Sequence, residues 1–178
     1  MNMYYFALKC IFTMIVLVTP SSTETLKPNF TQLNCIVLDK SFLAFEVCSL
    51  DSKSVVNIRL KLLKRPLDNI MLQGMIMKYT NGSYQNYYFN NLYDICKIMR
   101  SKRNVFVQFV YQLAMPYTNF NHTCPFNEPY MFVKNFPLDD IALHPLRMLT
   151  KGKYALIGTW MSNRIKRMNI ELYLTMQN

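Results

Sequence analysis

Only two histidines, His122 and His144, occur in the chain of 178 residues, so few side chains could act as a general base near neutral pH. His122 lies within an Asn-His-Thr-Cys-Pro segment and His144 directly precedes a proline, and neither stands beside a nucleophile motif. The acidic pair Asp139 and Asp140 follows Pro137 and is typical of a turn. We therefore expect no catalytic residues and no enzyme.

Residues 1–22 have the pattern of a secretory signal peptide, because Lys9 precedes a short apolar run and then small polar residues. The apolar run is shorter than the roughly 20 residues that a transmembrane helix needs. An uncleaved anchor is the alternative. Without Lys9, 19 basic residues face 10 acidic ones, which leaves a net charge near +9. We expect a secreted, extracellular protein whose mature domain spans residues 23–178.

The cysteines favour disulfide chemistry over metal binding. Loss of Cys10 with the signal peptide leaves four, an even number in an oxidising compartment. Because no two of them have Cys-x2-Cys spacing, we expect no metal site, and we expect no cofactor. The preferred pairing joins Cys35 to Cys48 across a hairpin centred on residues 40 and 41, and Cys96 to Cys124, while the other two connectivities stay open.

Three Asn-x-Ser/Thr motifs agree with passage through the secretory pathway. They begin at Asn29, Asn81 and Asn121, and each used site must face solvent. We expect a disulfide-bonded glycoprotein.

Alternation of apolar and polar residues predicts strands along most of the mature chain. The predicted strands cover residues 35–38, 42–50, 56–62, 70–80, 84–89, 130–135, 153–161 and 168–176, with a polar connection at 162–167. One or two short helices are expected, at residues 92–99 and at 104–114, where the pattern also fits a strand. Strands separated by turns, without long helices, predict a single all-β domain folded as an antiparallel β-sandwich.

The same alternation predicts which apolar side chains face inward. These candidates are Ile58, Leu60, Leu62, Leu72, Phe106, Phe109, Leu156, Trp160, Ile170 and Leu172. Together with 13 methionines, which adapt to variable apolar ligands, they could line a binding cavity. They could equally fill an ordinary core, and the sequence leaves both alternatives open.

Basic residues cluster at 59–65, 97–103 and 164–167. Such clusters can attract an anionic membrane or an acidic receptor surface, and they can equally be solvated faces. We expect no nucleic-acid partner, because the protein is predicted to be secreted and contains no motif that reads RNA or DNA. The sequence does not predict an oligomeric state.

Several motifs resemble a large insect family of secreted proteins of unknown function, related to the CheB-type chemosensory proteins. The resemblance rests on Cys35-x3-Asp39-x2-Phe42-x2-Phe45-x2-Cys48, Asp94-Ile95-Cys96, Asn121-His122-x-Cys124-Pro125, and Lys151-Gly152-Lys153-Tyr154 before Trp160. That family is in turn similar to the MD-2-related lipid-recognition group, which includes the GM2 activator. The resemblance implies an immunoglobulin-like sandwich whose sheets part to hold a lipid, and it transfers no catalytic residue.

We therefore expect a non-enzymatic binding protein for a lipid or other small hydrophobic ligand, acting in chemosensation, such as pheromone perception, or in lipid handling. The alternative is an extracellular interaction module with a filled core, which recognises a protein partner through its basic surface. An apolar cavity between the sheets would discriminate between the two.

Overall fold

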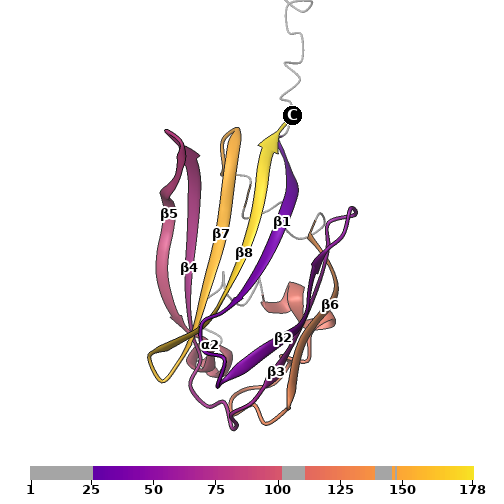
Figure 1. Cartoon of the computed structure of the whole chain (residues 1–178), viewed down its shortest axis with the longest axis vertical. Coiled ribbons are helices and arrows are strands. Elements are labelled where there is room, and N and C mark those ends of the chain that lie inside the picture. Colours follow the sequence, from indigo (N-terminus) through magenta and orange to yellow (C-terminus); the bar gives the residue numbers. More distant parts are fainter. Residues whose placement is uncertain (1–25, 102–110, 139–145, 147) are drawn as a thin grey trace, which may run out of the picture.

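The fold is a sandwich of two antiparallel sheets (Figure 1). The computed structural model describes residues 26–101, 111–138, 146 and 148–178. The larger sheet has the order β1-β8-β7-β4-β5, with bounds Lys27–Val37, Ile165–Gln177, Gly152–Ser162, Met71–Thr80 and Ser83–Asp94. The smaller has the order β2-β3-β6, with bounds Leu43–Leu50, Val55–Leu62 and Tyr130–Pro137. This architecture confirms the predicted all-β sandwich.

Strand β3 illustrates how the sequence pattern sets the two faces of a sheet. Its buried Ile58, Leu60 and Leu62 alternate with the exposed Arg59 and Lys61. Because side chains of a strand point to opposite faces in turn, the apolar set faces the larger sheet and the charged set faces solvent.

The hairpin between β4 and β5 turns at Asn81 and Gly82, both with positive φ, as the Asn-Gly dipeptide predicts. The prediction of a helical turn over residues 92–99 is wrong at its start, because β5 continues to Asp94. Helix α2, Ile95–Ser101, follows directly. The Asp94 carboxylate accepts a hydrogen bond from the Lys97 backbone N–H at 2.8 Å, so Asp94 caps the helix and fixes where it begins.

The hairpin between β7 and β8 is tighter than predicted. Only Asn163 and Arg164 form its turn, with φ of 53° and 63°, and residues 165–167 belong to β8. The polar composition of residues 162–167 predicted a longer connection. A two-residue turn was not expected, because it requires a left-handed conformation at Arg164, which arginine rarely adopts.

Both preferred disulfides are confirmed, but the reason given for the first is wrong. Cys35 and Cys48 do not face each other across a hairpin ladder, because β1 pairs with β8 and β2 pairs with β3. Their bond instead joins the two sheets across the sandwich. The second bond ties Cys96 of α2 to Cys124, with the Cα atoms 5.5 Å apart.

The predicted helix at 104–114 lies largely outside the described residues. Residues 111–114 are helical and lead into a single 3₁₀ turn, η1, at Met115–Tyr117. The predicted signal peptide also lies outside the described part. Within that part, every helix is too short or too polar to cross a bilayer.

The interior of the sandwich contains two clusters of buried side chains. One cluster, the packed core, consists of Phe30, Val56, Ile58, Leu138, Leu146, Leu149, Tyr154, Leu174 and Met176. The other, the α2-side core, consists of Phe42, Leu43, Leu60, Leu62, Leu67, Ile70, Ile95, Cys96, Met99, Phe126, Met131 and Met168. Most members of the α2-side core also line a cavity.

A candidate ligand cavity between the sheets

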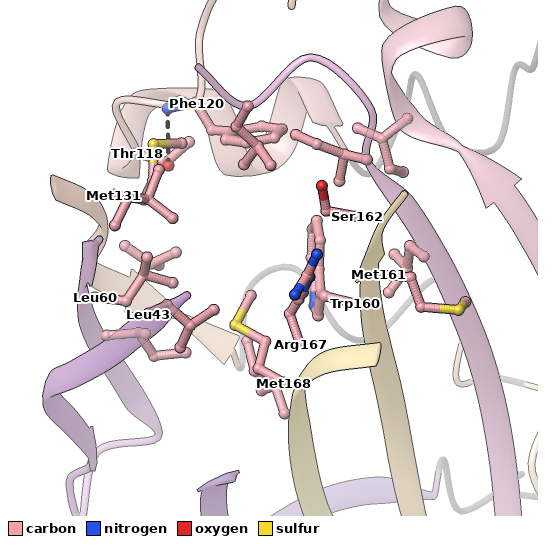
Figure 2. Close-up of a pocket in the computed structure, with 18 of the residues that line it drawn as sticks. Leu43, Leu60, Thr118, Phe120, Met131, Trp160, Met161, Ser162, Arg167 and Met168 are labelled. Carbon is pink, nitrogen blue, oxygen red and sulfur yellow. Dashed lines mark hydrogen bonds between the residues drawn. The ribbon is translucent and has the colours of Figure 1, made fainter. Parts of the chain in front are cut away.

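A cavity of about 330 Å³ lies between the two sheets, beside α2. Figure 2 shows Leu43, Leu60 and Met131 on one side of the open space and Trp160 and Met168 on the other. The volume is at the lower end of the roughly 300–1,000 Å³ that small-molecule sites occupy. The space therefore suits one compact or single-chain ligand.

The larger sheet supplies one wall through the inward positions of three neighbouring strands. Leu72 of β4, Trp160 of β7 and Ile170 of β8 line the cavity. Leu72 pairs directly with Trp160 in the β4–β7 ladder, so the two side chains lie on the same face of the sheet.

The smaller sheet supplies the opposite wall. Ile58, Leu60 and Leu62 of β3 line it, together with Met131 and Val133 of β6. In the β3–β6 ladder Ile58 pairs with Val133 and Leu60 with Met131, so these side chains share one face.

Helix α2 and the segment before β6 close one end of the cavity. Met99 of α2 and Phe120 of the segment both contribute lining side chains. The Phe120 ring stacks on Phe126 with centroids 4.1 Å apart and meets Trp160 edge to face at 6.3 Å. The Cys96–Cys124 disulfide joins α2 to this segment.

The ten predicted inward-facing residues divide into three groups. Ile58, Leu60, Leu62, Leu72, Trp160 and Ile170 line the cavity. Leu156 and Leu172 instead pack, partly buried, against the packed core. Phe106 and Phe109 lie outside the described residues.

Four lining residues carry polar groups that the sequence analysis did not select, namely Tyr111, Thr118, Ser162 and Arg167. The Thr118 hydroxyl is already used, because it donates to the Phe132 carbonyl at 2.6 Å and accepts from the Phe120 N–H at 3.1 Å. Arg167 was assigned to a basic cluster in a polar connection, yet it is only 9% exposed.

Arg167 is paired with Asp39, which precedes β2. One terminal nitrogen, Nη1, donates to the Asp39 carboxylate, and the guanidinium lies 4.2 Å from the centre of the Phe42 ring. Hydrogen bonds from the Ser41 hydroxyl, at 2.7 Å, and from Arg167 hold the pKa of Asp39 below its usual value. Asp39 therefore remains ionised at neutral pH.

His122 forms an exposed pair outside the cavity. Its ring contacts the Thr123 carbonyl at 2.8 Å and the Glu128 carboxylate at 2.9 Å, and both contacts raise the pKa of His122. No group of three His, Cys, Asp or Glu side chains among the described residues is arranged to hold a metal. His144, Asp139 and Asp140 lie outside the described residues.

The three predicted glycosylation residues, Asn29, Asn81 and Asn121, are all exposed. Asn29 lies on β1, Asn81 at the tip of the β4–β5 hairpin and Asn121 in the segment before β6. Each position therefore meets the steric requirement for carrying a glycan.

The fold and the cavity define a class of protein: an all-β sandwich with a mostly apolar cavity between its sheets. At the cavity wall of the described chain, the buried Arg167 pairs with the partly buried Asp39. Residues 72–156 match the model of a family described as a protein of unknown function, DUF1091. The match extends from β4 into β7 and includes α2 and β6. No curated protein matches the chain significantly.

Proposed function

We propose that this protein is a secreted, non-enzymatic binding protein for a lipid or other small hydrophobic ligand. The cavity carries the proposal, because its wall is built from aliphatic, aromatic and methionine side chains of both sheets and α2. Burial of an apolar ligand there would contribute roughly 25 cal/mol per Å² before the costs of ordering the ligand. The DUF1091 family, which matches residues 72–156, is associated with the MD-2-related lipid-recognition fold, and this association supports the same function.

The proposed setting is extracellular, in chemosensation or lipid handling. Two disulfides, one between the sheets and one at the cavity end, suit an oxidising compartment. Two pairs of disulfide-bonded cysteines also stabilise a sandwich whose interior is not completely filled, since each bond restricts the unfolded chain.

Exposed basic residues gather at the α2 end of the molecule, which is the lower end in Figure 1. They are Lys64 and Arg65 after β3, Lys97 and Arg100 on α2, and Arg164 and Lys166 at the β7–β8 hairpin. This distribution supports an anionic membrane or an acidic receptor surface as the partner at the cavity end. The same basic residues would form the binding surface in the alternative function, a module that recognises a protein partner.

Ligand uptake by a cavity-filled variant tests the proposal. Ala114 lines the cavity, so Ala114→Phe places a ring in the space that a ligand would occupy. Ala44 pairs with the exposed Lys61 on the outer face of the smaller sheet, so Ala44→Phe adds the same bulk away from the cavity.

We expect the wild type and Ala44→Phe to bind a fluorescent fatty acid with equal affinity, and Ala114→Phe to bind it at least tenfold more weakly. Circular dichroism verifies that each variant is folded. Absence of fatty-acid uptake by the folded wild type would favour the interaction module instead.

A further inference from the structure

Arg167 and Ser162 form a polar end of the cavity. From this end we propose that the ligand is a single-chain amphiphile with a carboxylate head, of the fatty-acid class, and that the head binds Arg167 and Ser162. This inference rests on the proposed function and adds to it the chemistry of the ligand.

A β-bulge turns Arg167 toward the interior. In the β7–β8 ladder Trp160 pairs with Met168 and Met161 pairs with Lys166, so Arg167 is an extra residue without a partner across the ladder. Such a residue breaks the alternation of faces, and here Arg167 and Met168 are both buried although they are consecutive. A local irregularity in one strand thus places a cation in an apolar wall.

The bulge is held in one position by the loop after β1. The Arg167 carbonyl accepts hydrogen bonds from the N–H groups of Leu38, at 2.9 Å, and Asp39, at 3.1 Å. The guanidinium stacks on Phe42, and the Asp39 carboxylate that it binds is itself held by Ser41. Because backbone and side chain are both fixed, the group is preorganised to bind a ligand.

Donor capacity at this end exceeds what the described residues use. Arginine has five N–H donors and no acceptor, and Nε of Arg167 is buried without a partner in the described part of the chain. Ser162 is 4% exposed, and its side chain also lines the cavity, where its hydroxyl can donate a hydrogen bond. Figure 2 shows the Ser162 oxygen and the Arg167 guanidinium on the same wall, beside Trp160.

The unpartnered Nε of Arg167 requires an acceptor, and the charges nearby favour an anionic one. Asp39 neutralises Arg167, but Lys64 adds a further cation, since its Nζ lies 3.4 Å from the Ser41 hydroxyl. A carboxylate fits the planar guanidinium and accepts from a hydroxyl at the same time. Apart from Tyr111 and Thr118, whose hydroxyl is already bonded, the remaining lining side chains are apolar, so the rest of the ligand is expected to be a hydrocarbon chain.

Four probes with one tail and different heads test the inference: lauric acid, methyl laurate, lauryl alcohol and laurylamine. Dissociation constants are measured at neutral pH by displacement of a fluorescent fatty acid. For the wild type we expect lauric acid to bind about tenfold or more tightly than the ester and the alcohol, because a charge-assisted hydrogen bond is lost with either. Laurylamine should bind most weakly.

A double variant isolates the role of the cation. Arg167→Gln combined with Asp39→Asn removes both charges, so that neither group is left as an unpaired ion. We expect the preference for the acid over the ester to fall close to one, with the affinity for the ester unchanged. Lys166→Gln is the matched control, because it removes one exposed basic residue next to Arg167 and should retain the full preference.

The carboxylate assignment is overturned if the wild type binds the acid and the ester equally, or if the double variant retains the preference. Ser162→Ala, a small change at a buried position, should weaken only the acid, by a few-fold. If none of the four probes binds the folded wild type, the proposed lipid-binding function itself fails, and this result is distinct from the loss of head-group preference.

Discussion

Arg167 is a buried charged residue in the wall of an otherwise mostly apolar cavity. Burial of a guanidinium is costly unless the group is paired. Here the Asp39 carboxylate forms an ion pair with Arg167, and the Phe42 ring packs against the guanidinium. The same pair anchors the loop between β1 and β2, because Asp39 also accepts two hydrogen bonds from Ser41. The charged pair therefore supports the cavity wall as well as the proposed head-group site.

Acid should remove the contribution of this pair to stability. The pKa of Asp39 in the folded protein is below its usual value of 3.8, first because of the Ser41 hydroxyl and then because of Arg167. A carboxyl group with a lowered pKa stabilises the fold above its unfolded pKa, and this stabilisation disappears as the pH falls through the folded pKa. We predict that Asp39→Asn has a lower melting temperature than wild type at neutral pH, and a smaller further loss between about pH 5 and pH 2.

Thermal unfolding followed by circular dichroism measures both effects. Asp68→Asn removes an exposed carboxylate elsewhere and serves as the control. Because this variant keeps Asp39, its melting temperature should fall in acid as much as that of the wild type. Equal acid-dependent losses in the wild type and in Asp39→Asn would show that the pair does not stabilise the fold.

Single residues were predicted well where strand alternation holds and poorly where it breaks. Leu60, Leu72 and Trp160 were selected from alternation alone, and all three line the cavity. Arg167 was missed because a bulge depends on the register between two strands, which one sequence does not reveal. The bulge makes Arg167 and Met168 both buried although they are consecutive. Because arginine is charged, the sequence pattern assigned Arg167 to the solvent side.

At the scale of elements, the β7–β8 hairpin contains a conformation that its sequence does not favour. Arg164 has a φ of 63°, a region that costs residues with a Cβ roughly 1–2 kcal/mol relative to glycine. We predict that Arg164→Gly, which creates the Asn-Gly turn typical of such hairpins, raises the free energy of unfolding by about 1 kcal/mol.

Urea unfolding measures this gain. Lys166→Gly is the comparison, because it lies in β8 two residues beyond and should lower the free energy of unfolding, by about 0.5–1 kcal/mol. A lower stability of Arg164→Gly than of wild type would mean that the turn does not adopt the conformation described above.

Elements whose partners lie close in the sequence were easier to predict than those with distant partners. The β4–β5 hairpin followed from Asn81 and Gly82, since two residues set that turn. The pairing of β1 with β8 joins the two ends of the described chain, and nothing local specifies it. The Cys35–Cys48 pair was therefore predicted correctly but for a wrong reason. The prediction assumed that the two strands form a hairpin, whereas β1 pairs with β8 and β2 pairs with β3.

At the scale of the whole molecule, the sandwich divides into a packed half and an open half. Tyr154, Leu174 and Met176 are almost completely buried in the packed core. The α2-side core instead surrounds the cavity, and the two disulfides hold the sheets and α2 around it. We infer that the packed half provides most of the folding stability, which leaves the open half available for a ligand.

Native mass spectrometry of the protein secreted from insect cells tests ligand binding most directly. We predict that the folded protein carries the mass of one small apolar molecule beyond its polypeptide and glycans, and that organic extraction releases this molecule. Ala114→Phe should be secreted without that mass, whereas Ala44→Phe should retain it. A wild-type protein that is secreted without bound lipid, and that takes up no fluorescent fatty acid, would contradict the proposed function.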